Sequence, residues 1–243
     1  MTLLFLALGF LTAIPVRLNQ PPGLGDLGRA AAWFPLVGLF IGSLTGLAAL
    51  LLAPILPAPV TAVILVALWA GLTGGLHLDG LADCGDGLLA AVAPERRLEI
   101  MRDPRLGTFG GMVLVLHLLF KASLLAATLP ATLIPLLAAP VIARWLLLIT
   151  ARQPLARPGG LGADFAAGIT WRTFVYAALV PLAVIVLGGW RALFGLLLAH
   201  LALVAVLRLA RSRLGGVTGD VMGLVVELGE TAVLLAFAAR MVA

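Results

Sequence analysis

Long runs of apolar residues dominate the chain, and short polar segments separate them. A helix that crosses a membrane needs about 20 mostly apolar residues. We expect spans, with boundaries good to a few residues, at about 3–16, 31–53, 59–76, 110–129, 131–150, 173–189, 192–208 and 221–240. The first stretch is short enough to lie at the interface or to insert halfway. The pattern therefore predicts an all-α, polytopic membrane bundle with seven or eight spans.

Composition agrees with this pattern. Of the 243 residues, 62% are hydrophobic and only 11% are charged. The 28 glycines allow helices to approach one another closely in lipid. No soluble domain, low-complexity tail or internal repeat stands out. We therefore predict a single transmembrane domain over residues 1–243, with a polar loop at 77–109 inside it.

The arginines are concentrated in alternate loops. The intervening loops carry only Arg191. The positive-inside rule assigns the arginine-rich loops to the cytoplasm, and it also explains the net charge of +5 without a nucleic-acid partner. The residues concerned are Arg17, Arg29, Arg96, Arg97, Arg102, Arg105, Arg152, Arg157, Arg172, Arg208, Arg211 and Arg213.

Two acidic clusters interrupt this apolar sequence. The first is H-L-D-G-L-A-D-C-G-D-G, from His77 to Gly87. The second is G-G-V-T-G-D-V-M-G-L-V-V-E-L-G-E, from Gly215 to Glu230. Carboxylates in a membrane protein are costly and usually functional. Because the charge pattern places both clusters at the cytoplasmic face, we interpret them as two halves of one site.

The first cluster has the spacing of a metal site. Asp79, Asp83 and Asp86 stand at i, i+4 and i+7, which is one face of a helix. Three carboxylates on one face repel one another unless a cation neutralises them. Carboxylate oxygens suit Mg²⁺, Mn²⁺ or Ca²⁺ better than zinc. We expect these residues and Asp220 to bind a metal; the alternative is a solvated helix start whose aspartates favour the helix dipole.

In the second cluster, Asp220 and Glu227 share a helix face, and Glu230 lies deeper in the last span. We expect Asp220 and Glu227 to contact metal or substrate. Lys121 and Arg144 also lie inside apolar spans, so they must face the bundle interior. A structural ion pair with one of them is the alternative interpretation of this cluster, and it applies most strongly to Glu230.

A phosphate site is indicated by R-D-P-R-L-G-T-F-G-G, from Arg102 to Gly111. Arg102 and Arg105 stand beside a glycine-rich helix start, whose free N–H groups favour an anion. The alternative for such arginines is anchoring at the membrane surface. Residues 94–101 predict a short surface helix that begins at Pro94. No phosphate-loop, zinc-protease or serine-hydrolase motif is present.

These blocks, with F-L-T-A-I-P-V at 10–16 and W-F-P-L-V-G-L-F-I-G at 33–42, occur in an order that resembles the cobalamin synthase family, the adenosylcobinamide-GDP ribazoletransferases. The resemblance covers nearly the whole chain. The family often has threonine at the position of Cys84 and serine at that of Pro104. Neither difference removes an expected ligand.

The resemblance implies a multi-pass, Mg²⁺-dependent transferase of the cytoplasmic (inner) membrane, with one catalytic domain whose active site faces the cytoplasm. It would join adenosylcobinamide-GDP to α-ribazole or its 5′-phosphate and release GMP. Membrane lipid would surround it, and a homo-oligomer or an association with other corrinoid-assembly enzymes is compatible with this expectation.

Each residue then has an expected role. The metal ligands would be Asp79, Asp83, Asp86 and Asp220; the proton acceptor would be Asp83, Asp86 or Glu227; and the groups that contact substrate or phosphate would be His77, Arg102, Arg105, Lys121, Arg144 and Glu230. One alternative is a CDP-alcohol-type phosphotransferase that acts on a lipid alcohol. An alternative of another class is a divalent-cation or proton-coupled transporter, for which broken spans at the midplane would be expected.

Overall fold

The computed structural model describes residues 2–18, 20–129, 131–157 and 159–239. Within these ranges all regular secondary structure is helical, apart from an isolated β-bridge between Leu155 and Val217. The helices are α1 (Thr2–Leu11), α2 (Asp26–Ala30), the 3₁₀ turn η1 (Ala31–Trp33), α3 (Phe34–Leu52), α4 (Ala58–Leu72), α5 (Leu76–Leu89), α6 (Pro94–Ile100), α7 (Thr108–Thr128), α8 (Ile134–Ala151), α9 (Gly160–Gly168), α10 (Trp171–Leu214) and α11 (Gly219–Ala238). The predicted all-α membrane fold is confirmed, and α6 is the predicted short surface helix.

The number of spans differs from the seven or eight predicted. By length and composition, five helical segments in the described ranges can cross a membrane: Asp26–Leu52, α7, α8, α10 and α11. A sixth results if α4 and α5, which meet at 94°, count as one bent span. The predicted segment 3–16 is the ten-residue α1, which is too short to cross. The multi-pass character remains.

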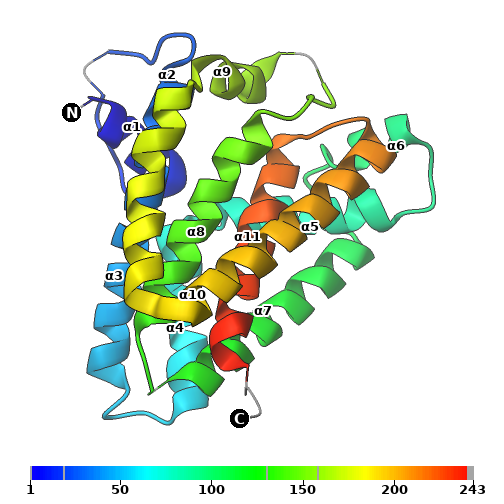
Figure 1. The fold of residues 1–243 in the computed structure, drawn as a ribbon. Helices are drawn as coiled ribbons and strands as arrows, with labels where there is room; N and C mark the ends of the chain where they lie inside the picture. Colours follow the sequence, from blue (N-terminus) through cyan, green and yellow to red (C-terminus); the bar gives the residue numbers. More distant parts are fainter. Residues whose placement is uncertain (1, 19, 130, 158, 240–243) are drawn as a thin grey trace.

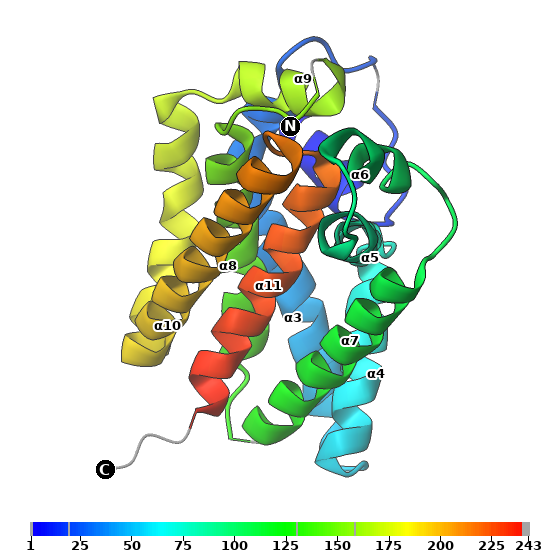
Figure 2. The ribbon, with the colours of Figure 1, turned by 90° about the vertical axis from the view of Figure 1, so that its right-hand side faces the viewer.

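Helix α10 contains two of the predicted spans, 173–189 and 192–208. Its 44 residues would be about 66 Å long if straight, against about 30 Å for a bilayer core. It is not straight, because Gly189 leaves the helical region with φ 59° and ψ −148°. Such a conformation is essentially restricted to glycine. The two arms of α10 fold back from this point, as Figures 1 and 2 show.

The bundle is organised around α8 and α11, whose side chains are largely buried. Helix α3 packs against α8 at two glycines: a Cβ on Gly38 would lie 2.4 Å from the Pro140 carbonyl oxygen, and one on Gly42 would lie 2.4 Å from that of Leu136. Small residues at such contacts bring helices close in lipid. Apolar side chains on the outer faces of α3, α7 and α10 remain exposed, as a lipid-facing surface requires.

The arginine-bearing segments lie at one end of the molecule. Figure 1 shows α2, α6, α9 and the α10–α11 connection there, and the α3–α4 and α7–α8 connections at the opposite end. The predicted sidedness of the loops is therefore reflected in the fold. Which compartment this end faces stays a prediction.

Candidate active site

The two acidic clusters meet where α5 crosses α11. A Cβ on Gly80 of α5 would lie 2.8 Å from the Asp220 carbonyl oxygen, and a Cβ on Gly223 of α11 would lie 3.1 Å from the His77 carbonyl oxygen. The two backbones therefore touch at these glycines: a Cβ on Gly80 would force a shift, and one on Gly223 would be unusually tight. This contact places the aspartates of α5 beside the first turn of α11, as the sequence predicted.

Among the described residues, the cluster carries more negative than positive charge. Asp83 is half-buried and stands in the repulsive field of Asp220, Asp79 and Asp86. The Thr218 hydroxyl donates a hydrogen bond of 3.2 Å to Asp220. Within the described ranges, no lysine or arginine forms an ion pair with Asp79, Asp83 or Asp220. Such a site favours a bound cation.

The four predicted metal ligands are not close enough together to form a coordination sphere. Among the described residues, no three histidine, cysteine or acidic side chains are placed to hold a metal ion together. The fit to Mg²⁺ therefore rests on oxygen donors and unbalanced charge. The metal assignment stays a prediction.

Asp86 contacts the start of α7. Its carboxylate accepts hydrogen bonds from the backbone N–H groups of Gly107, at 2.7 Å, and Gly110, at 2.8 Å. These amides have no carbonyl partner within the helix. The glycine-rich helix start that predicted a phosphate site therefore already binds an anion, the Asp86 side chain. A metal or catalytic role for Asp86 stays a prediction.

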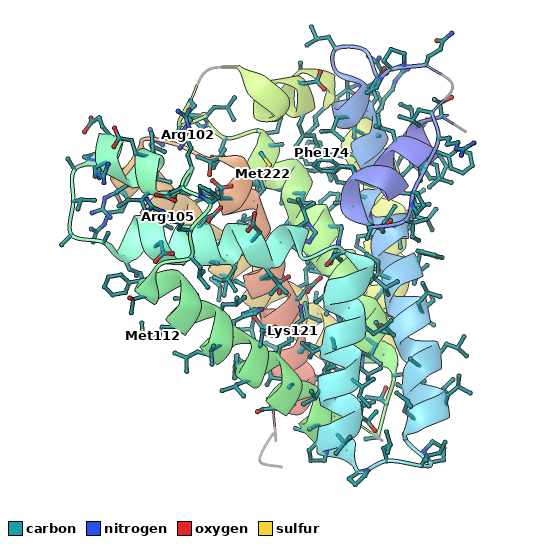
Figure 3. The ribbon with its side chains drawn as sticks, turned by 180° about the vertical axis from the view of Figure 1, so that it is seen from behind. Arg102, Arg105, Met112, Lys121, Phe174 and Met222 are labelled. Carbon is teal, nitrogen blue, oxygen red and sulfur yellow. The ribbon has the colours of Figure 1, made fainter. Side chains whose placement is uncertain are left out.

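Arg102 and Arg105 are exposed near this cluster, at the end of the molecule that carries α6 (Figure 3). Arg105 forms an ion pair with Asp103, in which Nη2 and Oδ2 are 2.6 Å apart. The side-chain hydrogen bond from Arg105 is the main cause that lowers the pKa of Asp103 to about 2. Arg105 must leave this partner to contact a phosphate, whereas Arg102 makes no ion pair in the described ranges.

Deeper in the bundle, five buried side chains form one ion-pair network. Glu227 accepts hydrogen bonds from Lys121, at 2.9 Å, and is 2.7 Å from Nε2 of His117. Glu230 binds both Lys121 and Arg144. The ion-pair alternative raised for Glu230 is thus observed. The predicted substrate contacts of these side chains stay predictions.

The network is set apart from the aspartates along α11. Glu227 and Glu230 lie about 10 and 15 Å from Asp220 along the helix axis. Figure 3 shows Lys121 well below Arg102 and Arg105 in the bundle. Lys121 also lies 4.5 Å from the centre of the Trp69 ring. Charge in the core is therefore balanced internally, unlike charge at the α5–α11 crossing.

Two cavities meet at Asp79. The smaller has a volume of about 200 Å³ and is lined by residues of α1, α2, α5, α8, α9 and α11. The larger has a volume of about 720 Å³ and lies against α1, α5, α7 and the α4–α5 turn. His77 lines the smaller cavity, is 4% exposed, and its Nδ1 has no hydrogen-bond partner among the described residues. His77 was predicted as a substrate-contacting residue.

Arg157 is a residue that the sequence did not single out. Its Nη2 donates a 2.5 Å hydrogen bond to the Leu98 carbonyl oxygen, and its buried Nε has no partner in the described structure. Burial lowers the pKa of Arg157, the nearby Arg102 adds to this effect, and Asp220 opposes it. Arg157 therefore brings positive charge toward the aspartates. As one loop arginine among several, it carried no distinguishing signal.

Comparisons with known proteins identify the family of the chain. The family model described as cobalamin-5-phosphate synthase matches residues 3–238. The adenosylcobinamide-GDP ribazoletransferase of Ectopseudomonas mendocina (strain ymp) is 43% identical, over 96% of this chain and 97% of that protein. The proteins of the same name from Pseudomonas aeruginosa and Desulfitobacterium hafniense (strain Y51) are 44% and 39% identical, over 97% and 96% of this chain and 97% and 94% of their own lengths. No solved structure matches. The chain belongs to the cobalamin-5-phosphate synthase family.

Proposed function

We propose that the protein is a transferase that joins the phospho-cobinamide group of adenosylcobinamide-GDP to α-ribazole or its 5′-phosphate. The reaction releases GMP and forms adenosylcobalamin or its 5′-phosphate. Family membership and the names of the relatives support this reaction. The observation that carries it is the crossing of α5 and α11 at Gly80 and Gly223, which gathers aspartates from both acidic clusters at the junction of two cavities.

Asp79, Asp83 and Asp220 are the side chains that would hold Mg²⁺ at this crossing. Asp86 would have to give up one of its two amide hydrogen bonds to join them. A bound Mg²⁺ would neutralise pyrophosphate charge and polarise the attacked phosphorus. Unbalanced carboxylate charge and the absence of an ion pair to these residues in the described ranges support this assignment.

In the transfer, side chains of the protein accept the proton and balance the charge of the leaving group. A ribose hydroxyl oxygen of the ribazole forms a bond to the phosphorus next to cobinamide, and the bond from that phosphorus to the bridging oxygen breaks. GMP leaves with the bridging oxygen, and the hydroxyl proton passes to a carboxylate. Of the three predicted acceptors, only Asp83 makes no hydrogen bond in the described structure, so we assign the proton to its carboxylate, at the oxygen that would not hold Mg²⁺. We assign Arg102 and Arg157 to balancing the charge on the departing phosphate.

We place the arginine-bearing end of the bundle in the cytoplasm and the bundle in the inner membrane. The positive-inside rule supports this orientation. Adenosylcobinamide-GDP is large and carries a charged pyrophosphate, so it reaches the aspartates from water at that end. Association with a second copy or with other corrinoid-assembly enzymes stays a prediction.

The test is GMP release by the purified protein in lipid vesicles. With adenosylcobinamide-GDP, α-ribazole and Mg²⁺, we expect GMP and the joined corrinoid in equal amounts. Omission of α-ribazole should stop the release. Addition of EDTA should stop it as well, and excess Mg²⁺ should restore it. Absence of GMP from the complete mixture would refute the transfer, whereas release that is insensitive to EDTA would refute the metal assignment alone.

A further inference from the structure

The smaller cavity has apolar and aromatic walls, which neither metal binding nor proton transfer by the aspartates requires. Its walls are mainly apolar, with Phe10 from α1, Phe165 from α9 and Leu147 from α8. Phe34 links the two aromatic rings behind the wall: its ring centre lies 5.8 Å from that of Phe10 and 5.4 Å from that of Phe165. Aromatic walls of this kind favour a planar apolar ring.

One of the residues that line this cavity, His77, carries a polar atom without a hydrogen-bond partner in the described structure. Nδ1 of His77 is buried and has no partner among the described residues, although buried polar groups are nearly always hydrogen-bonded. A neutral imidazole can donate one hydrogen bond to an acceptor nitrogen. A ligand with one acceptor nitrogen in an otherwise apolar ring would satisfy His77 without exposing another polar group to the walls.

The volume limits what can enter. The cavity holds about 200 Å³, less than the roughly 300–1,000 Å³ of pockets that enclose whole drug-sized ligands. It therefore admits one ring system and excludes a corrinoid. The cavity of about 720 Å³ on the other side of Asp79 is the larger and more open space.

We propose that the smaller cavity binds the benzimidazole ring of α-ribazole, with His77 Nδ1 hydrogen-bonded to the ring nitrogen that does not carry the ribose. The ribose then points toward Asp79 and Asp220, which line the same cavity. The corrinoid substrate approaches Asp79 from the larger cavity. This inference rests on the proposed function, and it names the residues that select the base.

The first experiment tests whether a larger cavity shifts the preference of the enzyme from α-ribazole to a nucleoside with a larger base. Leu147→Ala enlarges the smaller cavity, so a nucleoside with a benzannulated base, the naphthimidazole analogue of α-ribazole, should become a better substrate. A difference of one or more methylenes in an apolar pocket changes kcat/KM about 10–200-fold. We expect the kcat/KM ratio of the naphthimidazole nucleoside to α-ribazole to rise at least about tenfold. Both substrates are measured on one preparation, so the ratio does not depend on the folded fraction.

Leu118→Ala is the matched control, because Leu118 lines only the larger cavity. It should leave this ratio within about twofold of the wild-type value. An unchanged ratio in Leu147→Ala, or an equal rise in Leu118→Ala, would overturn the assignment of the smaller cavity.

The second experiment separates the two substrates at His77. His77→Leu should raise the KM for α-ribazole about tenfold and leave the KM for adenosylcobinamide-GDP unchanged, since one hydrogen bond to the base is lost. His77→Asn, whose amide N–H can replace Nδ1, should recover part of the loss. Equal changes in both KM values would overturn the hydrogen bond. Wild-type protein that releases no GMP would instead refute the transfer itself, so the two failures are distinguishable.

Discussion

Asp83 is repelled by aspartates of both acidic clusters, Asp79 and Asp86 of its own and Asp220 of the other. It is half-buried, three other aspartates repel it, and it makes no hydrogen bond in the described structure. Asp83→Asn keeps the shape and removes the charge. We expect GMP release to fall about 100-fold or more, the scale of a lost proton acceptor, with an unchanged melting temperature or a higher one. Turnover assays and circular dichroism on the same sample provide the measurement.

Asp103→Asn is the control for that substitution. Asp103 is bound to the exposed Arg105 and lies outside the α5–α11 crossing. It should retain near-wild-type turnover. Full activity of Asp83→Asn would exclude Asp83 from the chemistry.

Glu230 shows how a buried charge contributes to stability. It binds Lys121 and Arg144, and Arg144 has two further nitrogens, Nε and Nη2, without a partner among the described residues. Glu230→Gln leaves a buried cation without its counter-ion. We expect a loss of about 3–5 kcal/mol of unfolding free energy, measured by unfolding with sodium dodecyl sulfate in mixed micelles.

The double variant Glu230→Leu with Arg144→Leu removes both charges and should recover much of that loss. The exposed pair of Arg96 and Glu99 is the comparison, since Glu99→Gln should cost at most about 1 kcal/mol. A Glu230→Gln protein as stable as wild type would contradict a structural contribution from the network.

At the scale of elements, the site depends on how closely α5 approaches α11. A methyl group on Gly80 would lie 2.8 Å from the Asp220 carbonyl oxygen. Gly80→Ala must therefore push α5 away and separate Asp79 and Asp83 from Asp220. Because a displacement of about 1 Å can cost about 100-fold in rate, we expect a loss of that size in GMP release with helix content retained.

Gly46→Ala is the matched control in α3, because a Cβ there meets nothing within 4 Å. It should be active and as stable as wild type. If Gly80→Ala were equally active, the close crossing would not be needed to assemble the site.

At the scale of the whole molecule, the charged connections share one end of the bundle (Figure 1). Single cysteines at Arg96 and Arg213, on a Cys84→Ser background, should react with a membrane-impermeant maleimide from the same side of the membrane. A cysteine at Ile55, which is 76% exposed in the α3–α4 connection, should react only from the other side. Labelling is measured in intact cells and in inverted vesicles. Reaction of Arg96 and Arg213 positions from opposite sides would refute the composite site.

The sequence determined the features that arise from local spacing and additive hydrophobicity. Run length indicated membrane helices, and the i, i+4, i+7 spacing placed Asp79, Asp83 and Asp86 on one helix face. The alternation of arginines between loops indicated which connections share an end. Each of these inferences depends on neighbours within a few residues, so each could be made before the fold was known.

Only the tertiary structure decided which of these groups are bound to one another. Hydropathy cannot detect the break at Gly189, because an apolar window looks the same whether the backbone continues or turns. The aspartates on α5 look equivalent in sequence, yet Asp86 binds the start of α7 whereas Asp83 faces the aspartate cluster. The physical reason is that a buried charge takes its partner from whichever helix packs beside it, and packing joins residues distant in sequence, as Gly80 and Gly223 show.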